Sequence, residues 1–246
     1  VGHFALNANT TGTQNTAVGA YALEDNTTAD NNTALGYRAA RNLTTGSENT
    51  AIGQAALDTS TTAASCVAVG YQAMYYNTDG GENTAVGTNA LLNNTTAHNN
   101  TAVGYHSLLS NTTGTKCVAV GAYALDASDA DDNTAVGYNA MTANTTGIRN
   151  SALGQSALGA NTTGTRNTAI GAQALDASST ASYNTAIGYG SLTENTTGEY
   201  NTAVGQGSLL LNTTGQYNTA VGAYALDANT TSNSNTAVGY NGLTAN

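Results

Sequence analysis

Several residue types are scarce in this sequence or missing from it. In 246 residues there is no proline and no tryptophan, there are only two cysteines, and only 8% of the residues are charged. Globular domains usually carry about 25% charged residues, and the shortage of Lys and Glu removes the usual solvent face of amphipathic helices. Two cysteines are too few for a disulfide framework, and no apolar run approaches the roughly 18 residues of a membrane helix. We therefore expect neither a helical bundle, nor a disulfide-stapled domain, nor a segment inserted in a membrane.

Positive charge is particularly scarce. Fifteen acidic residues against five basic ones give a formal net charge of −10. Nucleic acids and anionic membrane surfaces attract proteins through clustered Lys and Arg, so neither is an expected partner. The five bases are scattered along the chain: Arg38, Arg41, Lys116, Arg149 and Arg166.

The sequence is dominated by one repeated phrase, Asn-Thr-Ala-Val-Gly, and its close variants. Its spacing is 17 residues throughout, except for one step of 16 between Gly121 and Gly137. Regularly placed aliphatic residues argue against a disordered chain, and a fixed period indicates a stacked repeat architecture. The glycines that end the fifteen copies are Gly2, Gly19, Gly36, Gly53, Gly70, Gly87, Gly104, Gly121, Gly137, Gly154, Gly171, Gly188, Gly205, Gly222 and Gly239.

The repeat can be numbered from 1 to 17, with the phrase at positions 1 to 5. Position 5 is always Gly, position 3 always Ala, position 4 always Val, Ile or Leu, and position 9 usually Leu, while positions 12 to 15 usually read Asn-Thr-Thr-Gly. Seventeen residues are too few for two helices and a turn, but they suit short strands with Gly and Asn corners. We predict an all-β fold, a parallel β-solenoid (β-roll or β-helix) of about fifteen 17-residue coils. Residues 1–246 are expected to form a single repeat array, a fragment of a longer repeat protein.

Strand alternation predicts which side chains face the interior of the coil. Positions 2 and 4 share one face of a strand, and position 2 becomes Val67 and Val118 in the copies that begin with Cys66 and Cys117. We therefore expect positions 2, 4 and 9 to fill the coil and positions 6 and 10 to be exposed. Position 3 would then face outward, where a column restricted to Ala indicates close packing against another copy of the chain. This column predicts a homo-oligomer or filament.

The apolar variant Cys66-Val67-Ala68-Val69-Gly70 resembles the repeat of the head domain of YadA-like trimeric autotransporter adhesins. Ala51-Ile52-Gly53 and Ala169-Ile170-Gly171 match that motif as well. The longer phrase, with Asn212-Thr213-Thr214-Gly215, is similar to repeats in bacterial and phage tail-fibre-like proteins. The adhesin resemblance implies left-handed parallel β-rolls assembled as trimers, and it favours three chains.

Few residues suggest chemistry. His3, His98 and His106 have no acid and nucleophile placed with them as a triad requires, so no catalytic residues are predicted and an enzyme is not expected. The shortened copy holds four carboxylates that could bind a hard cation such as Ca²⁺; the alternative is a solvated acidic loop. These carboxylates belong to Asp126, Asp129, Asp131 and Asp132.

Three further features have both a functional and a structural interpretation. Tyr183, Tyr200 and Tyr217 lie on consecutive coils and could contact glycans or partner proteins, or simply pack against one another. Cys66 and Cys117 could be small buried fillers, which we favour, or a ring of cysteines across an oligomer axis. The Asn-Thr-Thr segments create sequons for N-glycosylation, although turn geometry and Asn ladders explain them first. The sequon residues of the Asn-Thr-Thr segments are Asn9, Asn26, Asn94, Asn111, Asn144, Asn161, Asn195, Asn212 and Asn229.

The sequence therefore favours a structural role: a segment of an extracellular fibre, an adhesin stalk or a tail fibre, on a cell surface or a virion. In such an array each coil packs only against its neighbours. One alternative is a glycan- or receptor-binding module that uses the tyrosines. The other is an ice-binding solenoid that uses the Thr columns at positions 13 and 14.

Overall fold

The computed structural model describes residues 1–244, which divide into two compact units. The first unit is Val1–Ala122 and the second begins at Tyr123. Strands β1 to β7 of the first unit are Thr16–Val18, Thr33–Leu35, Thr50–Ile52, Val67–Val69, Thr84–Val86, Thr101–Val103 and Val118–Val120. Strands β8 to β14 of the second unit are Thr134–Val136, Ser151–Leu153, Thr168–Ile170, Thr185–Ile187, Thr202–Val204, Thr219–Val221 and Thr236–Val238.

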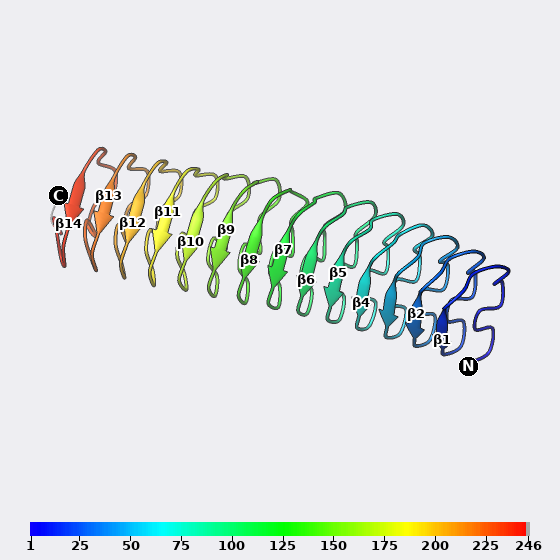
Figure 1. The fold of residues 1–246 in the computed structure, drawn as a ribbon. Coiled ribbons are helices and arrows are strands. Elements are labelled where there is room, and N and C mark those ends of the chain that lie inside the picture. The colour runs from blue at the N-terminus through cyan, green and yellow to red at the C-terminus, as the bar shows by residue number, and fades with distance from the viewer. Residues whose placement is uncertain (245–246) are drawn as a thin grey trace. The chain divides into compact units, whose positions relative to one another are not determined.

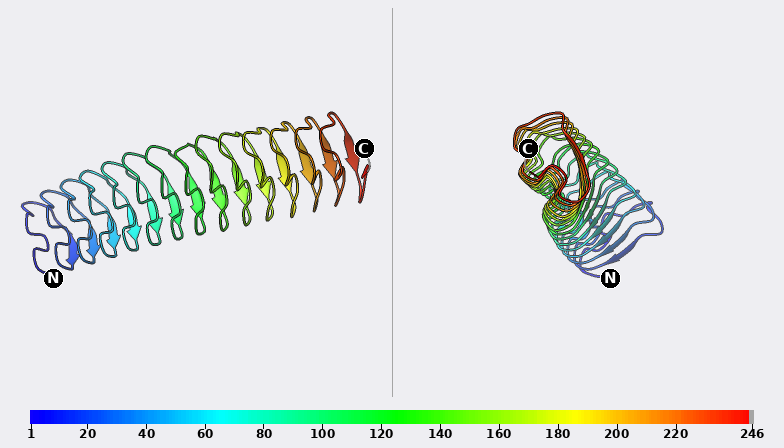
Figure 2. Two further views of the ribbon diagram at one scale, coloured as in Figure 1. Left: turned by 180° about the vertical axis from the view of Figure 1, so that it is seen from behind. Right: turned by 90° about the vertical axis from the view of Figure 1, so that its left-hand side faces the viewer.

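Within each unit, every strand pairs in parallel with the strand of the next coil (Figure 1). The register joins equivalent repeat positions, as in Ala51 with Ala68 and Ala169 with Ala186. Two further views show the same stacking of coils within each unit (Figure 2). The predicted all-β parallel solenoid with coils of about 17 residues is confirmed. There are fourteen strands and not fifteen, because the first copy starts at Val1, which is already position 4.

The described residues contain strands, turns and bends but no helix. Consequently nothing in this part of the chain qualifies as a helix long and apolar enough to cross a bilayer.

The interior of the coil is built from small and medium side chains. Position 3 is buried in every strand, and position 9 is fully buried from Leu23 to Leu226. Where position 9 shrinks to Ala40, position 12 of the same coil enlarges to Leu43, and both side chains are buried. The predicted burial of position 9 is therefore confirmed. The exchange of Ala40 and Leu43 shows that the interior of one coil has room for one side chain of the size of Leu and little more.

The predicted orientation of the strands was wrong. Positions 2 and 4 point outward and position 3 points inward. In each strand the middle residue is buried, and the residues before and after it are exposed or half-buried. Position 10, expected to be exposed, is half-buried in most coils, and Asp58 at this position is fully buried. Ala at position 3 is invariant because the narrow interior admits only a methyl group.

Glycine at position 5 makes the corner that follows each strand. Gly53 has a φ of +130°, and a Cβ placed on it would lie 2.4 Å from the carbonyl oxygen of Gly70 in the next coil. Both the backbone conformation and the close approach exclude any larger residue.

Two ladders of buried Asn side chains close the coils. At position 1, the Nδ2 of Asn49 donates to the carbonyl of Ala63 at 2.8 Å, and its Oδ1 accepts from the backbone N–H of Cys66 at 3.0 Å. At position 12, the Nδ2 of Asn94 donates to the Oδ1 of Asn77 at 2.6 Å and to a backbone carbonyl at 3.1 Å. These bonds satisfy amides that would be costly to bury unpaired.

Both cysteines are buried at position 1 and neither is in a disulfide, which confirms their prediction as fillers. The Cys66 thiol takes the place of the Asn amide, since its Sγ lies 3.3 Å from the carbonyl oxygen of Gly80. Burial raises the pKa of Cys66 to about 11, so the thiol stays protonated and can act as this weak donor.

Candidate functional site

Positions 2 and 4 of the strands form an outward surface in each unit, which we call the outer sheet face. Position 2 contributes Thr in eleven strands, Val in two and Ser in one, and position 4 contributes only Val, Ile or Leu. Several of the position-4 side chains are strongly exposed, including Leu35 at 47% and Leu153 at 49%. Parallel pairing places successive rows about 4.8 Å apart, so each unit presents a regular array of methyl groups and hydroxyls.

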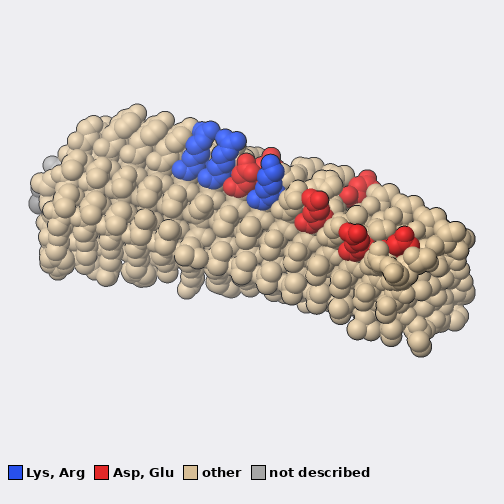
Figure 3. All heavy atoms as spheres, in the orientation of Figure 1, with Lys and Arg blue, Asp and Glu red and all other residues tan. Residues whose placement is uncertain are grey.

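The outer sheet face carries no charged residue on any of the fourteen strands. Figure 3 shows that, in this view, charged side chains cover only a small part of the surface of each unit. Charged residues at position 17, next to the buried Asn that precedes each strand, include Glu48, Glu82 and Lys116 in the first unit. In the second unit Asp132 at this position forms an ion pair with Arg149 at 3.6 Å.

In the second unit a shallow hollow of about 250 Å³ lies on the outer sheet face. Its lining includes Val136, Leu153 and Ile170 at position 4 and Ser151 at position 2. Ser151 stands where most copies have Thr, and its missing methyl group leaves part of this space open.

The interior position of the Ala column changes the argument for self-association. Ala135 and Ala169 are fully buried inside the coil. Position 3 is therefore restricted to Ala because the interior is narrow, and not because a partner chain packs against it. The restriction that does require an external explanation is at position 4, which is aliphatic in all fifteen copies although it faces outward.

Tyr183, Tyr200 and Tyr217 form the ladder expected from the sequence. Their rings stack nearly parallel, with centroids 4.8 Å and 5.1 Å apart. The Arg166 guanidinium lies 5.3 Å from the centre of the Tyr183 ring, and its Nη1 donates to the Tyr183 hydroxyl. Sugars usually pack on aromatic faces, but here the facing surfaces are covered by neighbouring rings, which favours the packing interpretation.

The four carboxylates proposed as a Ca²⁺ site do not come together as ligands. Among residues 1–244 there is no group of three or more His, Cys, Asp or Glu side chains placed to hold a metal ion. Asp132 is instead paired with Arg149. The geometry thus favours the alternative of an acidic loop for Asp126, Asp129, Asp131 and Asp132.

The sequon asparagines are part of the position-12 ladder. Eight of the nine are buried, and only Asn9, in the first coil, is exposed. A glycan would be attached to Nδ2, which is the atom that donates the ladder bonds in Asn94 and Asn161. Burial therefore argues against glycans on the folded coil at Asn26, Asn94, Asn111, Asn144, Asn161, Asn195, Asn212 and Asn229.

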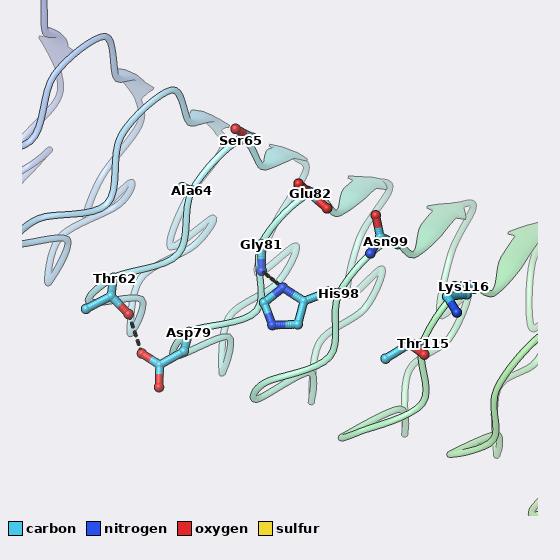
Figure 4. Close-up of a pocket in the computed structure, with 10 residues that line it drawn as sticks. All are labelled: Thr62, Ala64, Ser65, Asp79, Gly81, Glu82, His98, Asn99, Thr115 and Lys116. Carbon is cyan, nitrogen blue, oxygen red and sulfur yellow. Dashed lines mark hydrogen bonds between the residues drawn. The ribbon is translucent and has the colours of Figure 1, made fainter.

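One of the three histidines takes part in a groove of the first unit (Figure 4). The groove has a volume of about 610 Å³ and runs along positions 14, 16 and 17 of neighbouring coils. His98 Nδ1 accepts the backbone N–H of Gly81 at 2.9 Å, and Asp79 accepts the Thr62 hydroxyl. The lining is Thr62, Ala64, Ser65, Asp79, Gly81, Glu82, His98, Asn99, Thr115 and Lys116.

An ion cluster at positions 7 and 10 of the first unit joins the buried Asp58 to two partly exposed arginines. The Asp58 carboxylate is 2.7 Å from Nη2 of Arg38 and 3.3 Å from Nε of Arg41. Burial raises the pKa of Asp58 although Arg41 and Arg38 lower it in part. In the second unit, burial and then the charge of Glu194 raise the pKa of Asp176.

These shifts predict that the protein becomes more stable as the pH is lowered from 8 to about 5. A carboxyl whose pKa is higher in the folded state takes up its proton first when folded, so lowering the pH favours the folded chain. Hydrogen bonds from Thr13 lower the pKa of Asp30, so this carboxylate has the opposite effect on stability, which begins only as the pH falls to about the ordinary aspartate pKa of 3.8. Thermal melts over this pH range measure the trend, and Asp176→Asn should flatten it. A melting temperature that falls steadily from pH 8 to pH 5 would contradict this account.

Comparison with protein-family models, curated proteins and solved structures finds no match for this chain.

Proposed function

We propose that this chain is a structural segment of an extracellular fibre, an adhesin stalk or a tail fibre, and that it assembles with further copies of itself through the outer sheet face. The observation that supports this is the position-4 column. It is aliphatic in all fifteen copies and yet faces outward, as in Leu153 and Ile170. A solvated surface tolerates polar residues freely, and extended apolar surface usually marks an interaction site.

A second copy of the chain suits this face better than an unrelated partner. Both surfaces would carry the same repeat, so that side chains of one sheet fit between the rows of the other along many coils. The hollow bordered by Leu153 and Ile170 would receive an aliphatic side chain of the neighbour. No charge has to be desolvated, and each added coil extends the contact by the same amount.

Three chains are favoured by the resemblance to YadA-like heads. In a trimer the three outer sheet faces would surround a common axis and remove these apolar rows from water. The same arrangement suits a surface fibre, because its length can grow by adding coils.

The two alternatives have less support. Glycan binding by the tyrosines would need open ring faces, which stacking covers between Tyr183, Tyr200 and Tyr217. Ice binding by positions 13 and 14 would need free hydroxyls, but at position 13 Thr27 and Thr95 donate to carbonyls of the next coil.

Light scattering on the purified chain tests the proposal. At micromolar concentration we expect a mass of at least two chains, each of 24.6 kDa. The double variant Val86→Glu, Ile187→Glu, which places one charge on the outer sheet face of each unit, should be monomeric and folded. The control Thr96→Glu, Thr163→Glu adds the same charge at exposed position 14 and should still associate. A wild-type monomer, or a control that dissociates equally, would contradict the proposal.

A further inference from the structure

The groove in the first unit arises from an interrupted ladder at position 16. In several coils the backbone N–H of position 16 donates to the side chain at position 16 of the next coil, which acts as its acceptor. The accepting group can be a carboxylate, hydroxyl, imidazole or amide, but it always belongs to the residue at position 16. The pairs are Thr13 to Asp30, Asp30 to Ser47, Gly81 to His98, Thr165 to Ser182 and Gln216 to Asn233, at 2.6 to 3.0 Å.

The acceptor is missing at Gly81, and also at Ala64 and Ile148, whose side chains cannot accept a hydrogen bond. Ala64 and Gly81 lie on successive coils and both line the groove. Gly81 is the only glycine at position 16, so it offers no side chain to the N–H of Ala64 in the preceding coil. Among the described residues, none accepts a hydrogen bond from that N–H. A Cβ on Gly81 would lie 3.0 Å from the carbonyl oxygen of Ala64 and 3.7 Å from its nitrogen. His98 Nδ1 would lie 3.5 Å from the same Cβ, so the place of the side chain is closely bordered. The Ala64 N–H can instead donate to an oxygen-bearing group that enters the groove from outside the chain.

The groups around this vacancy are rich in hydrogen-bond acceptors. Asp79 and Glu82 contribute carboxylates on opposite sides of Gly81, and Ser65 lies on the same side as Glu82 (Figure 4). Because Nδ1 of His98 accepts a bond, its neutral ring carries the proton on Nε2 and can donate to a ligand. The Lys116 ammonium and the Asn99 amide supply further donors.

We propose that this groove binds a pyranose, such as a hexose unit of a polysaccharide. One hydroxyl would accept from the Ala64 N–H in the place of the missing side chain, and neighbouring hydroxyls would donate to Asp79 and Glu82. The two carboxylates repel an anionic ligand, whereas a neutral polyol satisfies acceptors and donors alike. The volume of about 610 Å³ is within the range of small-molecule sites. The groove lies at positions 14, 16 and 17, and its binding does not depend on self-association.

Saturation-transfer NMR with methyl α-glucopyranoside, methyl β-galactopyranoside and methyl α-mannopyranoside, each at millimolar concentration, tests this site. We expect transfer to at least one glycoside. Gly81→Ser places a hydroxyl in the vacancy, as Ser47 and Ser182 do in their coils. It should weaken binding by about tenfold or more, because it removes both space and the free donor. The φ of Gly81 is not in the left-handed region, but the added Cβ would lie 3.0 Å from the carbonyl oxygen of Ala64. A thermal melt of the variant therefore distinguishes a loss of binding from a loss of the fold.

Two further variants sharpen the test. Asp79→Asn keeps the shape of the groove but removes a charged acceptor and should also weaken binding. Thr165→Ser changes position 16 in the second unit and should bind as the wild type does. The proposal is overturned if none of the three glycosides shows transfer, if Gly81→Ser binds as well as the wild type, or if ethanolamine binds and the glycosides do not.

Discussion

Replacing Ala169 with Asp is expected to unfold the coils around β10, with a fall in melting temperature of roughly 10 °C or more. Ala169 is fully buried, and the carboxylate would have no partner in an interior lined by methyl groups. An unpaired buried charge costs several kcal/mol, and each kcal/mol lowers the melting temperature of a chain of this size by about 2 to 4 °C. Circular dichroism during thermal melting measures the effect.

Ile170→Asp is the matched control, because it introduces the same group one residue later in the same strand. Ile170 points outward and is 38% exposed, so the charge remains hydrated. We expect the fold of a single chain of this variant to lose less than about 1 kcal/mol. At micromolar concentration, where we propose that the wild type associates, the variant should be monomeric. If Ile170→Asp unfolds the chain and Ala169→Asp does not, the orientation of the strands is reversed from that described above.

This pair of residues also shows where sequence reasoning succeeds and where it fails. The 17-residue period, the parallel pairing of equivalent positions and the burial of Leu at position 9 follow from the repetition itself. The orientation of the strand side chains does not follow, because the pattern Thr-Ala-Val fits a strand with Ala facing inward as well as one with Thr and Val facing inward. Bulk suggested that Val lies inside and Ala outside. The structure has the reverse, because the coil is too narrow for a second aliphatic row beside Leu175 and its equivalents.

A signal for the correct facing was nevertheless present in the sequence. Position 3 never departs from Ala, whereas position 4 changes among Val, Ile and Leu. A closed interior tolerates no change of volume, while an outer surface that packs on a neighbour tolerates small ones. Val67 and Val118, at position 2 of the two cysteine copies, favoured the opposite orientation, with position 2 inside. In the structure, however, Val67 is 37% exposed.

The groove at Gly81 was missed for a different reason. Sequence comparison among the copies shows position 16 as freely variable, with Thr, Asp, Ser, His, Glu and Asn among its residues. Most residues in this column can accept a hydrogen bond from the preceding coil, as Ser47 and His98 do, whereas Ala64, Gly81 and Ile148 cannot. The lone Gly in that column was the available signal, and its meaning depends on a backbone contact that only the structure shows.

The second large effect is expected at the position-5 corner, where Gly188→Ala should cost more than about 3 kcal/mol. Gly188 has a φ of +133°, and its added Cβ would lie 2.5 Å from the carbonyl oxygen of Gly205. That atom is backbone held by the next coil and cannot move aside, so the coils must separate. Hydrogen exchange, which reports local opening of the stacked coils, together with thermal melting, measures the loss.

Gly190→Ala, two residues away, provides the comparison. Gly190 has a φ of +62°, which is left-handed as well, but its added Cβ would be 3.3 Å from the Thr193 hydroxyl oxygen and touch no backbone atom. Other coils place Ala55 and Gln173 at the same repeat position with φ of 56° and 59°. The cost should therefore be about 1 kcal/mol, the usual penalty for a side chain in this conformation. Equal losses in the two variants would mean that the left-handed backbone, and not the contact between successive coils, requires glycine at position 5.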